Sequence, residues 1–400
     1  MTNSLPTPSF LVDESALAAQ VDSFQEAMAT YWPTGIVSYS VKTNALPWIV
    51  SWMARQSVWA EVVSDHEYEL ALALGHRPER IIFNGPAKSR EVMLEALSAG
   101  ALVNLDSHRE VRWVAEYARA HPAHDVAVGV RVNWDVDGDC PGATASGADG
   151  LRFGFHVETD LWNVIDTLSG AGVRIAGLHL HVTSLKREIS VYKSAARTVR
   201  RILLERSLML DYIDIGGGFF GGADPRFPTP HQYLRAIREE LTDPNSPVDP
   251  SRTRLIIEPG SALVAVALEF HTSVLDTKRV PGGRIVVTDG SRTNIDPFFR
   301  KTSYRFRIES AGPPSAEHQI ICGFTCLDND RLMALDAAPY LSEGDRIIYE
   351  AVGSYTMCFT PLFINLFPAT YVRREDGRIL VAREPWSLPQ YLAKDDWTAT

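Results

Sequence analysis

The sequence predicts an α/β protein in which a (β/α)8 TIM-like barrel is followed by a C-terminal all-β domain. Eight short apolar segments rich in valine and isoleucine alternate with stretches that carry helix-start signals. Most of these segments are apolar without interruption, as parallel strands are when helices cover both faces of a sheet. Beyond about residue 265 the alternation stops, and strand-like segments flank turn sequences instead. A doubly wound open sheet alternates in the same way and is the alternative for the first part.

The barrel is expected to consist of β/α units in chain order. Capping boxes at Ser64–Glu67 and Ser107–Glu110, and a Thr-Pro start at Thr229–Gln232, indicate helices after the second, fourth and seventh strands. The expected strands are Ile36–Val41, Trp59–Val63, Arg80–Asn84, Ala101–Asp106, Val126–Asn133, Ile175–His181, Tyr212–Ile215 and Leu255–Glu258.

The C-terminal part is expected to be antiparallel. Leu268–Val280 and Arg284–Asp289 flank a Pro-Gly-Gly turn. An Asp-Gly pair between Thr370–Arg374 and Arg378–Ala382 is a strong hairpin signal. Pro8–Val12 is strand-like and precedes the barrel, so we expect it to pair into this domain. The expected organisation is an N-terminal segment (1–30) that contributes to the β domain, a barrel (31–265) with a loop at Asp135–Gly150, and a β domain (266–400).

Composition indicates a cytoplasmic globular protein. Lysine and arginine number 39 against 49 aspartates and glutamates, a net charge of −10, which argues against nucleic-acid or anionic-membrane surfaces. No apolar run is long enough to span a bilayer, and MTNSLPTPSF lacks the features of a signal peptide. The cysteines have no metal-ligand spacing and are expected to be reduced thiols: Cys140, Cys322, Cys326 and Cys358.

Two charged residues stand where barrel enzymes place their chemistry, at the C-terminal ends of strands. Lys42 follows the first strand and is either a rim lysine or a Schiff-base nucleophile in an enclosed site. Glu258 ends the eighth strand, where a carboxylate needs a partner. A protonated pyridine nitrogen is one such partner, and an arginine within the barrel is the other.

Glycines and histidines follow two further strands. Gly216–Gly218 follows the seventh strand, where barrels often bind phosphate, although any tight loop uses glycine. His179 and His181 are two residues apart, so both side chains point the same way. They could ligate a metal, but no third or fourth ligand is evident from strand placement, and an imidazole packed on an aromatic cofactor is simpler. A lysine, a phosphate loop, a carboxylate and an imidazole together match the needs of pyridoxal 5′-phosphate (PLP).

From Thr7 to about Phe367 the chain resembles the fold-type III PLP decarboxylases, whose barrel and β domain have the alanine racemase-like fold. This group contains the diaminopimelate, ornithine and arginine decarboxylases. The resemblance is carried by YSVKTN, AEVVS, GLHLHVTS, IDIGGGF, EPG, GFTC and EAVGSYT. It implies that Lys42 carries PLP, that His181 stacks on the ring and that Glu258 holds the pyridine nitrogen. The other cofactor contacts it implies are Glu61, Ser64, Ser184, Gly216, Gly217, Gly218, Gly260 and Tyr355.

The resemblance also implies a reaction and an assembly. The substrate amine displaces Lys42 to form an external aldimine, carbon dioxide leaves, and Cys326 protonates the α-carbon. In this group the cysteine comes from the partner subunit of a head-to-tail homodimer, so the active sites lie between subunits.

Three residues depart from the family pattern. Ser261 stands where an arginine normally follows EPG and helps to bind phosphate, and Thr183 replaces a glycine. Leu327 replaces the acidic residue that meets the substrate's distal amine. Because an unpaired distal ammonium costs about 1–3 kcal/mol, we expect a substrate other than plain lysine, ornithine or diaminopimelate, from specialised metabolism. A larger or acidic substrate would meet Arg292, Arg300, Lys301, Asp328 and Tyr355, although the basic residues among these could be a solvated edge.

Three other functions remain open. Racemases of this fold type place arginine, not glutamate, against the pyridine nitrogen, so Glu258 favours decarboxylation. A non-catalytic homologue acting as an interaction protein would accumulate departures such as Leu327. A metal-dependent barrel hydrolase would use His179 and His181, but we expect no metal.

Overall fold

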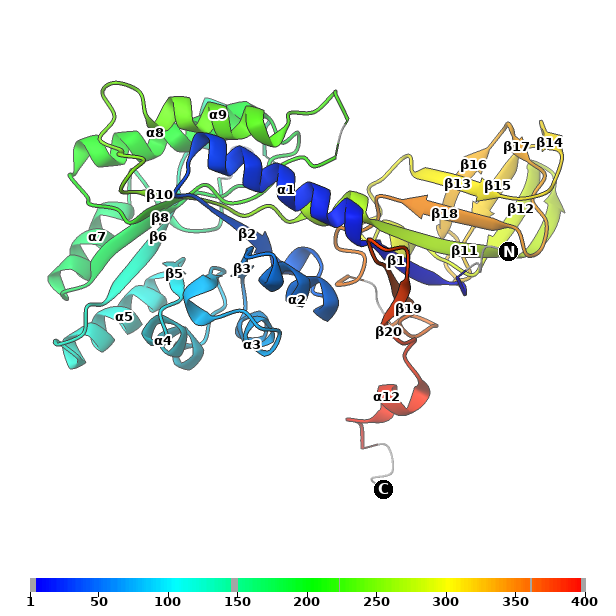
Figure 1. The fold of residues 1–400 in the computed structure, drawn as a ribbon, viewed down its shortest axis with the longest axis horizontal. Coiled ribbons are helices and arrows are strands. Elements are labelled where there is room, and N and C mark those ends of the chain that lie inside the picture. The colour runs from blue at the N-terminus through cyan, green and yellow to red at the C-terminus, as the bar shows by residue number, and fades with distance from the viewer. Residues whose placement is uncertain (1–4, 145–149, 223, 360–361, 397–400) are drawn as a thin grey trace. The chain divides into compact units, whose positions relative to one another are not determined.

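The computed structural model describes residues 5–144, 150–222, 224–359 and 362–396. The chain divides into two compact units, one of residues 20–263 and one of residues 1–19 with 264–400 (Figure 1). Helix α1 (Glu14–Tyr31) runs across the first boundary, and the short helix α10 (Ser261–Val264) across the second.

The first unit is a closed barrel within the described residues. Parallel pairing runs β2-β3-β4-β5-β6-β8-β9-β10 and returns from β10 to β2, so the open-sheet alternative is wrong. A two-residue strand, β7 (Phe155–His156), pairs outside the circle with β6. All eight expected segments form barrel strands, within one or two residues at each end: β2 (Ile36–Ser40), β3 (Trp59–Val62), β4 (Ile81–Phe83), β5 (Leu102–Leu105), β6 (Ala127–Asn133), β8 (Arg174–His179), β9 (Tyr212–Asp214) and β10 (Arg254–Ile257).

Helices follow the strands, and their first residues can be compared with the three helix starts that the sequence predicted. Thr229 and Gln232 form the complete capping box that their spacing predicts. Ser64 accepts a hydrogen bond from the Glu67 amide as predicted, but Ser107 makes no cap bond. The helices of this unit, besides α1 and α10, are α2 (Pro47–Arg55), α3 (Asp65–Ala73), α4 (Arg90–Ser98), α5 (His108–Ala120), α6 (Val136–Asp139), α7 (Leu161–Gly170), α8 (Ile189–Glu205) and α9 (Pro230–Leu241).

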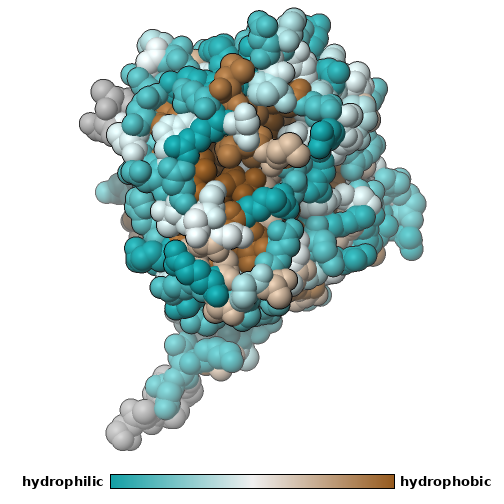
Figure 2. All heavy atoms as spheres, turned by 90° about the vertical axis from the view of Figure 1, so that its left-hand side faces the viewer, coloured by the Kyte–Doolittle hydropathy of each residue, from teal (hydrophilic) through white to brown (hydrophobic). Residues whose placement is uncertain are grey.

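The two ends of the barrel differ in character. At the N-terminal ends of the strands, a hollow of about 540 Å³ is lined by residues that include Leu102, Ala176 and Tyr212. Figure 2 views this side of the molecule and shows apolar side chains in a hollow ringed by hydrophilic ones. The Tyr212 ring lies inside the barrel, where a Cβ on Gly177 would lie 2.2 Å from it. Polar side chains collect at the opposite, C-terminal end.

The second unit is mostly β-sheet. Its main sheet has the order β16-β15-β12-β11-β1-β19-β20, with β18 pairing β11 and β13. Both expected hairpins form, and β1 joins this sheet as predicted. The expectation of purely antiparallel pairing is wrong for β1 with β19 and for β12 with β15, which are parallel. The strands are β1 (Ser9–Asp13), β11 (Leu268–Val280), β12 (Gly283–Thr288), β13 (Arg305–Glu309), β14 (Pro314–Ser315), β15 (Gln319–Cys322), β16 (Arg331–Leu335), β17 (Ala338–Pro339), β18 (Arg346–Glu350), β19 (Ala369–Arg373) and β20 (Ile379–Arg383).

Short helices occur in two places where the sequence predicted none, the C-terminal β domain and the loop at 135–150. The β unit contains α11 (Arg292–Ile295) and α12 (Leu388–Leu392), so it is not purely β. The segment predicted as a loop at 135–150 begins with α6, where Asp135 caps the Gly138 amide, and residues 145–149 lie outside the described residues. No helix in the described part of the chain is long and apolar enough to cross a membrane.

Candidate active site

Lys42 lies at the C-terminal end of β2, in a short 3-10 turn (Val41–Thr43). Its Nζ is 2.6 Å from Glu61 Oε2 and 2.7 Å from Ser40 Oγ, and Ser40 in turn donates to the same carboxylate oxygen. The Lys42 side chain is 37% exposed, whereas that of Glu61 is 2% exposed. The amine is therefore accessible, and its counter-ion is fixed in the barrel wall.

Glu258 directly follows β10 and is buried. Asn84, at the end of β4, donates its side-chain amide to Glu258 Oε1 at 2.6 Å and to Glu61 Oε1 at 3.2 Å. One amide group thus connects the carboxylate beside Lys42 with the carboxylate predicted to bind a pyridine nitrogen.

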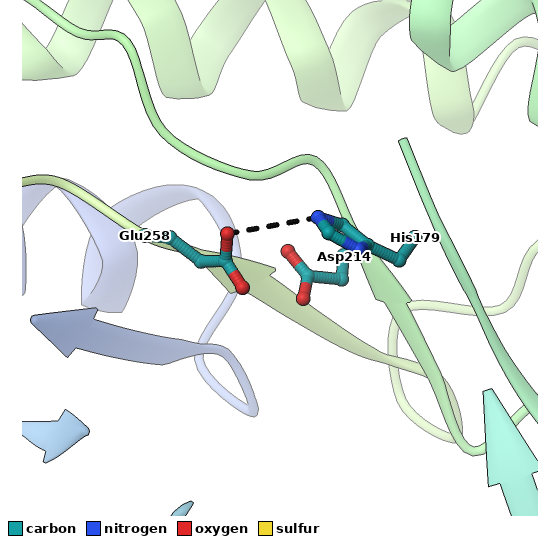
Figure 3. A group of neighbouring side chains, drawn as sticks. All are labelled: His179, Asp214 and Glu258. Carbon is teal, nitrogen blue, oxygen red and sulfur yellow. Dashed lines mark ion pairs between the residues drawn. The ribbon is translucent and has the colours of Figure 1, made fainter. Parts of the chain in front are cut away.

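Glu258 belongs to a cluster of three buried side chains at the C-terminal ends of neighbouring barrel strands. His179 at the end of β8, Asp214 at the end of β9 and Glu258 converge, with His179 Nε2 3.6 Å from Glu258 Oε2 (Figure 3). Burial and then the negative charge of Glu258 raise the pKa of Asp214 well above its ordinary value. Burial opposes ionisation of Glu258 as well, but His179 and the hydrogen bond from Asp214 outweigh it and lower the pKa of Glu258. The pair therefore holds one proton on Asp214 and leaves Glu258 ionised.

The same cluster shows that the sequence expectation of no further metal ligand beside the two histidines is wrong for His179. Asp214 and Glu258 bring ligand atoms within 4.8 Å of those of His179, although strand placement suggested no further ligands beside the histidine pair. His181 does not join this group. Its ring lies parallel to that of His179, with 6.4 Å between centroids, on the same side of the chain as predicted.

A chain of hydrogen bonds supports Asn84 from inside the barrel. Tyr212 OH donates to Asn104 Oδ1 at 2.8 Å, and Asn104 Nδ2 donates to Asn84 Oδ1 at 2.8 Å. Because its oxygen is held this way, the Asn84 amide must point its donors at the carboxylates. Sequence reasoning missed both asparagines, although an amide in an apolar strand, as in IIFN and LVNL, was an available signal.

His181 packs against the glycine loop that follows β9. A Cβ on Gly216 would lie 2.5 Å from His181 Cβ, and the Gly217 amide donates to His181 Nδ1 at 3.2 Å. Burial, reinforced by nearby Arg131, lowers the pKa of His181 to about 3. The imidazole is therefore neutral, with its hydrogen on Nε2.

Backbone geometry in the loop requires glycine. Gly216 and Gly218 have φ of 69° and 90°, and a Cβ on Gly217 would lie 2.4 Å from the Glu258 carbonyl oxygen. Gly260, after Glu258, packs so closely that a Cβ would lie 2.1 Å from Thr43 Oγ1, next to Lys42. The Gly216 amide donates to Asp214 Oδ1 at 2.8 Å and the Gly217 amide to His181, so within the described residues only the Gly218 amide of the three has no protein acceptor.

Two other site residues were not singled out from the sequence. Arg131, in β6, is buried and donates to the His181 carbonyl at 3.3 Å, with its Nε 3.7 Å from Asp106 Oδ1. A charged residue within AVGVRVN was the available signal. Glu67 was predicted only as part of the capping box of α3. Its carboxylate accepts a hydrogen bond from the Val63 amide, and burial raises its pKa to about 7.

Two serines have hydrogen-bonding roles of their own. Ser64 Oγ accepts a hydrogen bond from the Glu67 amide at 3.2 Å and caps α3, so this hydroxyl oxygen is already engaged. Ser184, five residues beyond β8, is buried and accepts from the Arg187 amide at 2.9 Å.

The remaining predicted residues lie in the β unit. Cys326 is exposed, and the Tyr355 ring packs edge-on to Phe298 with 5.4 Å between centroids. Arg292 pairs with buried Asp296 at 3.0 Å, and its contact with substrate stays a prediction.

Asp296 also organises the neighbouring basic residues. It accepts hydrogen bonds from the backbone amides of Arg300 and Lys301, and Lys301 Nζ donates to the Ile295 carbonyl. The Arg300 side chain instead lies over Phe298, 5.8 Å from the ring centroid. Asp328 is exposed, with no side-chain hydrogen bond or ion pair among the described residues, whereas buried Asp330 accepts hydrogen bonds from Ser291, Thr325 and the Arg292 amide.

The barrel residues fit PLP. An accessible lysine, an ionised carboxylate, a neutral imidazole and a glycine loop lie together at one end of the barrel: Lys42, Glu258, His181 and Gly216–Gly218. Both ring nitrogens of His179 also lack a hydrogen-bond partner among the described residues. This donor set supplies a Schiff-base nitrogen, an anion for a pyridinium, a flat stacking partner and an amide for the phosphate.

Comparisons with known proteins give the same assignment. The family described as "Pyridoxal-dependent decarboxylase, pyridoxal binding domain" matches residues 15–265. The diaminopimelate decarboxylase of Actinosynnema pretiosum subsp. auranticum is 29% identical over 394 residues, 94% of this chain and 86% of that protein. The probable chloroplastic diaminopimelate decarboxylase of Oryza sativa subsp. japonica is 27% identical over 398 residues, 96% of this chain and 79% of that protein.

Solved structures share the fold. Diaminopimelate decarboxylase from M. jannaschii, in complex with L-lysine, has a TM-score of 0.85 at 22% identity and covers 98% of this chain and 92% of its own. The Helicobacter pylori enzyme complexed with L-lysine has a TM-score of 0.81 at 22% identity, with 98% and 97% covered. Together with the site, these matches establish a PLP-dependent amino-acid decarboxylase of fold type III. The chain belongs to the pyridoxal-dependent decarboxylase family.

Proposed function

We propose that this enzyme decarboxylates an amino acid or amino-acid conjugate whose distal end carries carboxylate rather than a bare ammonium group, at a site where Lys42 carries the cofactor. The observation that carries the assignment of the site is the ionised Glu258 held by Asn84 next to Lys42 and Glu61. When bound, PLP supplies an electron sink for the pair of electrons left by departing carbon dioxide.

The residues around Lys42 control its proton. Glu61 Oε2 and Ser40 Oγ both contact Nζ, so a proton leaving the amine has an acceptor within hydrogen-bond distance. Glu61 is itself held by Asn84, which fixes this acceptor beside the Lys42 amine.

Three further groups orient the ring and its phosphate. Glu258, which is ionised and held by the Asn84 amide, would keep the pyridine nitrogen protonated. Neutral His181 would offer a flat face to the ring without adding a competing charge. The Gly218 amide and the Ser184 hydroxyl would bind the phosphate, with Gly260 as a further contact in the barrel unit, and the resemblance implies Tyr355 as another contact.

The protonation step is assigned to Cys326, contributed by the partner subunit of a homodimer. Its exposure in the β unit supports this role, because a thiol that reaches another subunit's site must lie at the surface. As general acid it delivers its proton to the α-carbon after carbon dioxide leaves. No disulfide links the cysteines of the described residues, which supports a reducing, cytoplasmic setting.

The substrate assignment rests on Leu327 and Arg300. Leu327 is 41% exposed and offers no charge to a distal ammonium. Since Arg292 is paired with Asp296, Arg300 is the cation best placed to take a distal carboxylate, beside Phe298 and Tyr355. The curated relatives are named for diaminopimelate, which makes that compound the most direct challenge to this assignment.

A decarboxylation screen with mass detection tests the proposal. The panel contains diaminopimelate, lysine, ornithine, arginine and amino acids that carry carboxylated conjugates such as a citryl group. The expected result is turnover of a carboxylated conjugate, reduced about 10- to 100-fold by Arg300→Ala. Leu327→Glu is expected to raise turnover of diaminopimelate or lysine. Efficient decarboxylation of diaminopimelate by the unaltered enzyme would contradict the substrate assignment while leaving the reaction intact.

A further inference from the structure

We propose that Arg187 provides the positive charge that binds the cofactor phosphate in this chain, in place of the arginine that is absent at position 261. The inference rests on the proposed placement of the phosphate at Gly216–Gly218 and Ser184. Position 261 carries an uncharged serine at the start of α10, so a dianionic phosphate needs its cation from elsewhere in the barrel unit.

Arg187 contacts both elements proposed to bind the phosphate. Its Nη1 donates to the carbonyl of Phe219, the residue that follows Gly218, at 3.1 Å. Its backbone amide donates to Ser184 Oγ at 2.9 Å, which fixes the hydroxyl of that serine. The guanidinium therefore lies at the end of the glycine loop, and the backbone of the same residue holds the serine.

No described carboxylate pairs with the guanidinium of Arg187. The residue is half-buried, and within the described ranges it forms no ion pair and only the one side-chain hydrogen bond to Phe219. Its guanidinium lies 5.1 Å from the ring centroid of Phe220, on an apolar face. A guanidinium has five N–H donors, so most of them are available to an anion.

The backbone holds Arg187 in an unusual conformation. Its φ is 53°, in the left-handed region that side chains other than glycine rarely adopt. Buried Tyr233 donates its hydroxyl to the Arg187 carbonyl at 2.6 Å and keeps the turn in place. Strained backbone held by neighbours is typical of functional positions.

Lys186 offers a matched control. It has the same charge one residue earlier, but it is exposed and pairs with Glu188 at 3.8 Å. If general positive potential near the turn were enough, removal of either charge would weaken cofactor binding equally. Our proposal predicts that only Arg187 matters.

The test measures cofactor affinity rather than turnover. Apoprotein is titrated with PLP and with pyridoxal, which lacks the phosphate, and dissociation constants are read from absorbance. Arg187→Ala is expected to weaken PLP binding about 10- to 100-fold and to leave pyridoxal binding unchanged. Arg187→Lys is expected to lie between, because a lysine cannot form the bidentate contact. Lys186→Ala is expected to match the unaltered protein, and Arg187→Ala combined with Ser261→Arg to recover PLP affinity.

Other results would overturn the proposal. Equal loss of PLP and pyridoxal affinity in Arg187→Ala would assign the residue a structural role. Unchanged PLP affinity with a raised KM would assign the guanidinium to the substrate. If the unaltered protein bound pyridoxal as tightly as PLP, the phosphate site itself would be wrong, whereas loss of affinity in Ser184→Ala but not Arg187→Ala would reject Arg187 alone.

Discussion

The side-chain amide of Asn84 donates a 2.6 Å hydrogen bond to the carboxylate of Glu258, although 174 positions separate the two residues in the chain. The same amide reaches Glu61, so two buried carboxylates share one donor group. Its oxygen is fixed by Asn104, which Tyr212 holds in turn. The orientation of Glu258 thus depends on side chains that reach into the barrel interior.

Replacing Asn84 by leucine should destabilise the protein. The two carboxylates would lose a buried donor, and an unsatisfied buried group costs about 1–3 kcal/mol. Urea unfolding of Asn84→Leu measures the change, with exposed Asn245→Leu as the control. A loss no larger than that of the control would show that the Asn84 bonds contribute nothing.

The buried ion pair of Lys88 and Glu110 should behave as a coupled unit. Both side chains are fully buried with Nζ and Oε2 3.1 Å apart, so Lys88→Met leaves a buried carboxylate unpaired and should cost about 3–5 kcal/mol. Lys88→Met combined with Glu110→Gln should recover part of this loss, because no unpaired charge remains. Additive losses in a double-mutant cycle of unfolding free energies would refute the coupling.

Glu67 should make stability depend on pH. Its folded pKa of about 7 exceeds the ordinary value of 4.5, so the folded state binds more protons between these values. The contribution of this group therefore favours folding below about pH 4.5 and is lost as the pH rises to about 7, at up to about 1.4 kcal/mol per pH unit. Relative to the unaltered protein, Glu67→Gln should gain stability from pH 5 to pH 8. Parallel pH profiles of the two proteins would be the opposite outcome.

Cys326→Ala should separate cofactor binding from turnover. If the thiol is the general acid, kcat should fall about 100-fold or more, while the absorbance of bound PLP stays unchanged. Cys358→Ala, at another exposed cysteine of the β unit, is the control and should keep full activity. Equal activity of the two variants would remove Cys326 from the mechanism.

Much of the barrel site could be predicted because strand ends converge in this fold. Lys42, Glu258 and the glycine loop follow apolar segments whose parallel pairing brings their ends together. Asn84 and Arg131 were missed because both lie within predicted apolar strands and were treated as strand residues, without a functional role. Their roles depend on which residues face them across the barrel, which local sequence does not specify.

The sequence also did not indicate two ion pairs, one made by Glu110 and one by Arg292. Ser107 fits a capping pattern, but the Glu110 carboxylate pairs with buried Lys88 and accepts the Asp106 amide instead. Contact of Arg292 with substrate stays a prediction, but its ion pair with Asp296, four residues later, was not foreseen. In both places local sequence did not indicate the ion pair.

The most direct test of the account is to locate the cofactor. The protein is loaded with PLP, reduced with borohydride, digested and examined by mass spectrometry, and the label should be on Lys42. Lys42→Ala should carry no label and release no carbon dioxide from any substrate of the panel. A label on another lysine, or decarboxylation that survives in Lys42→Ala, would contradict the central claim.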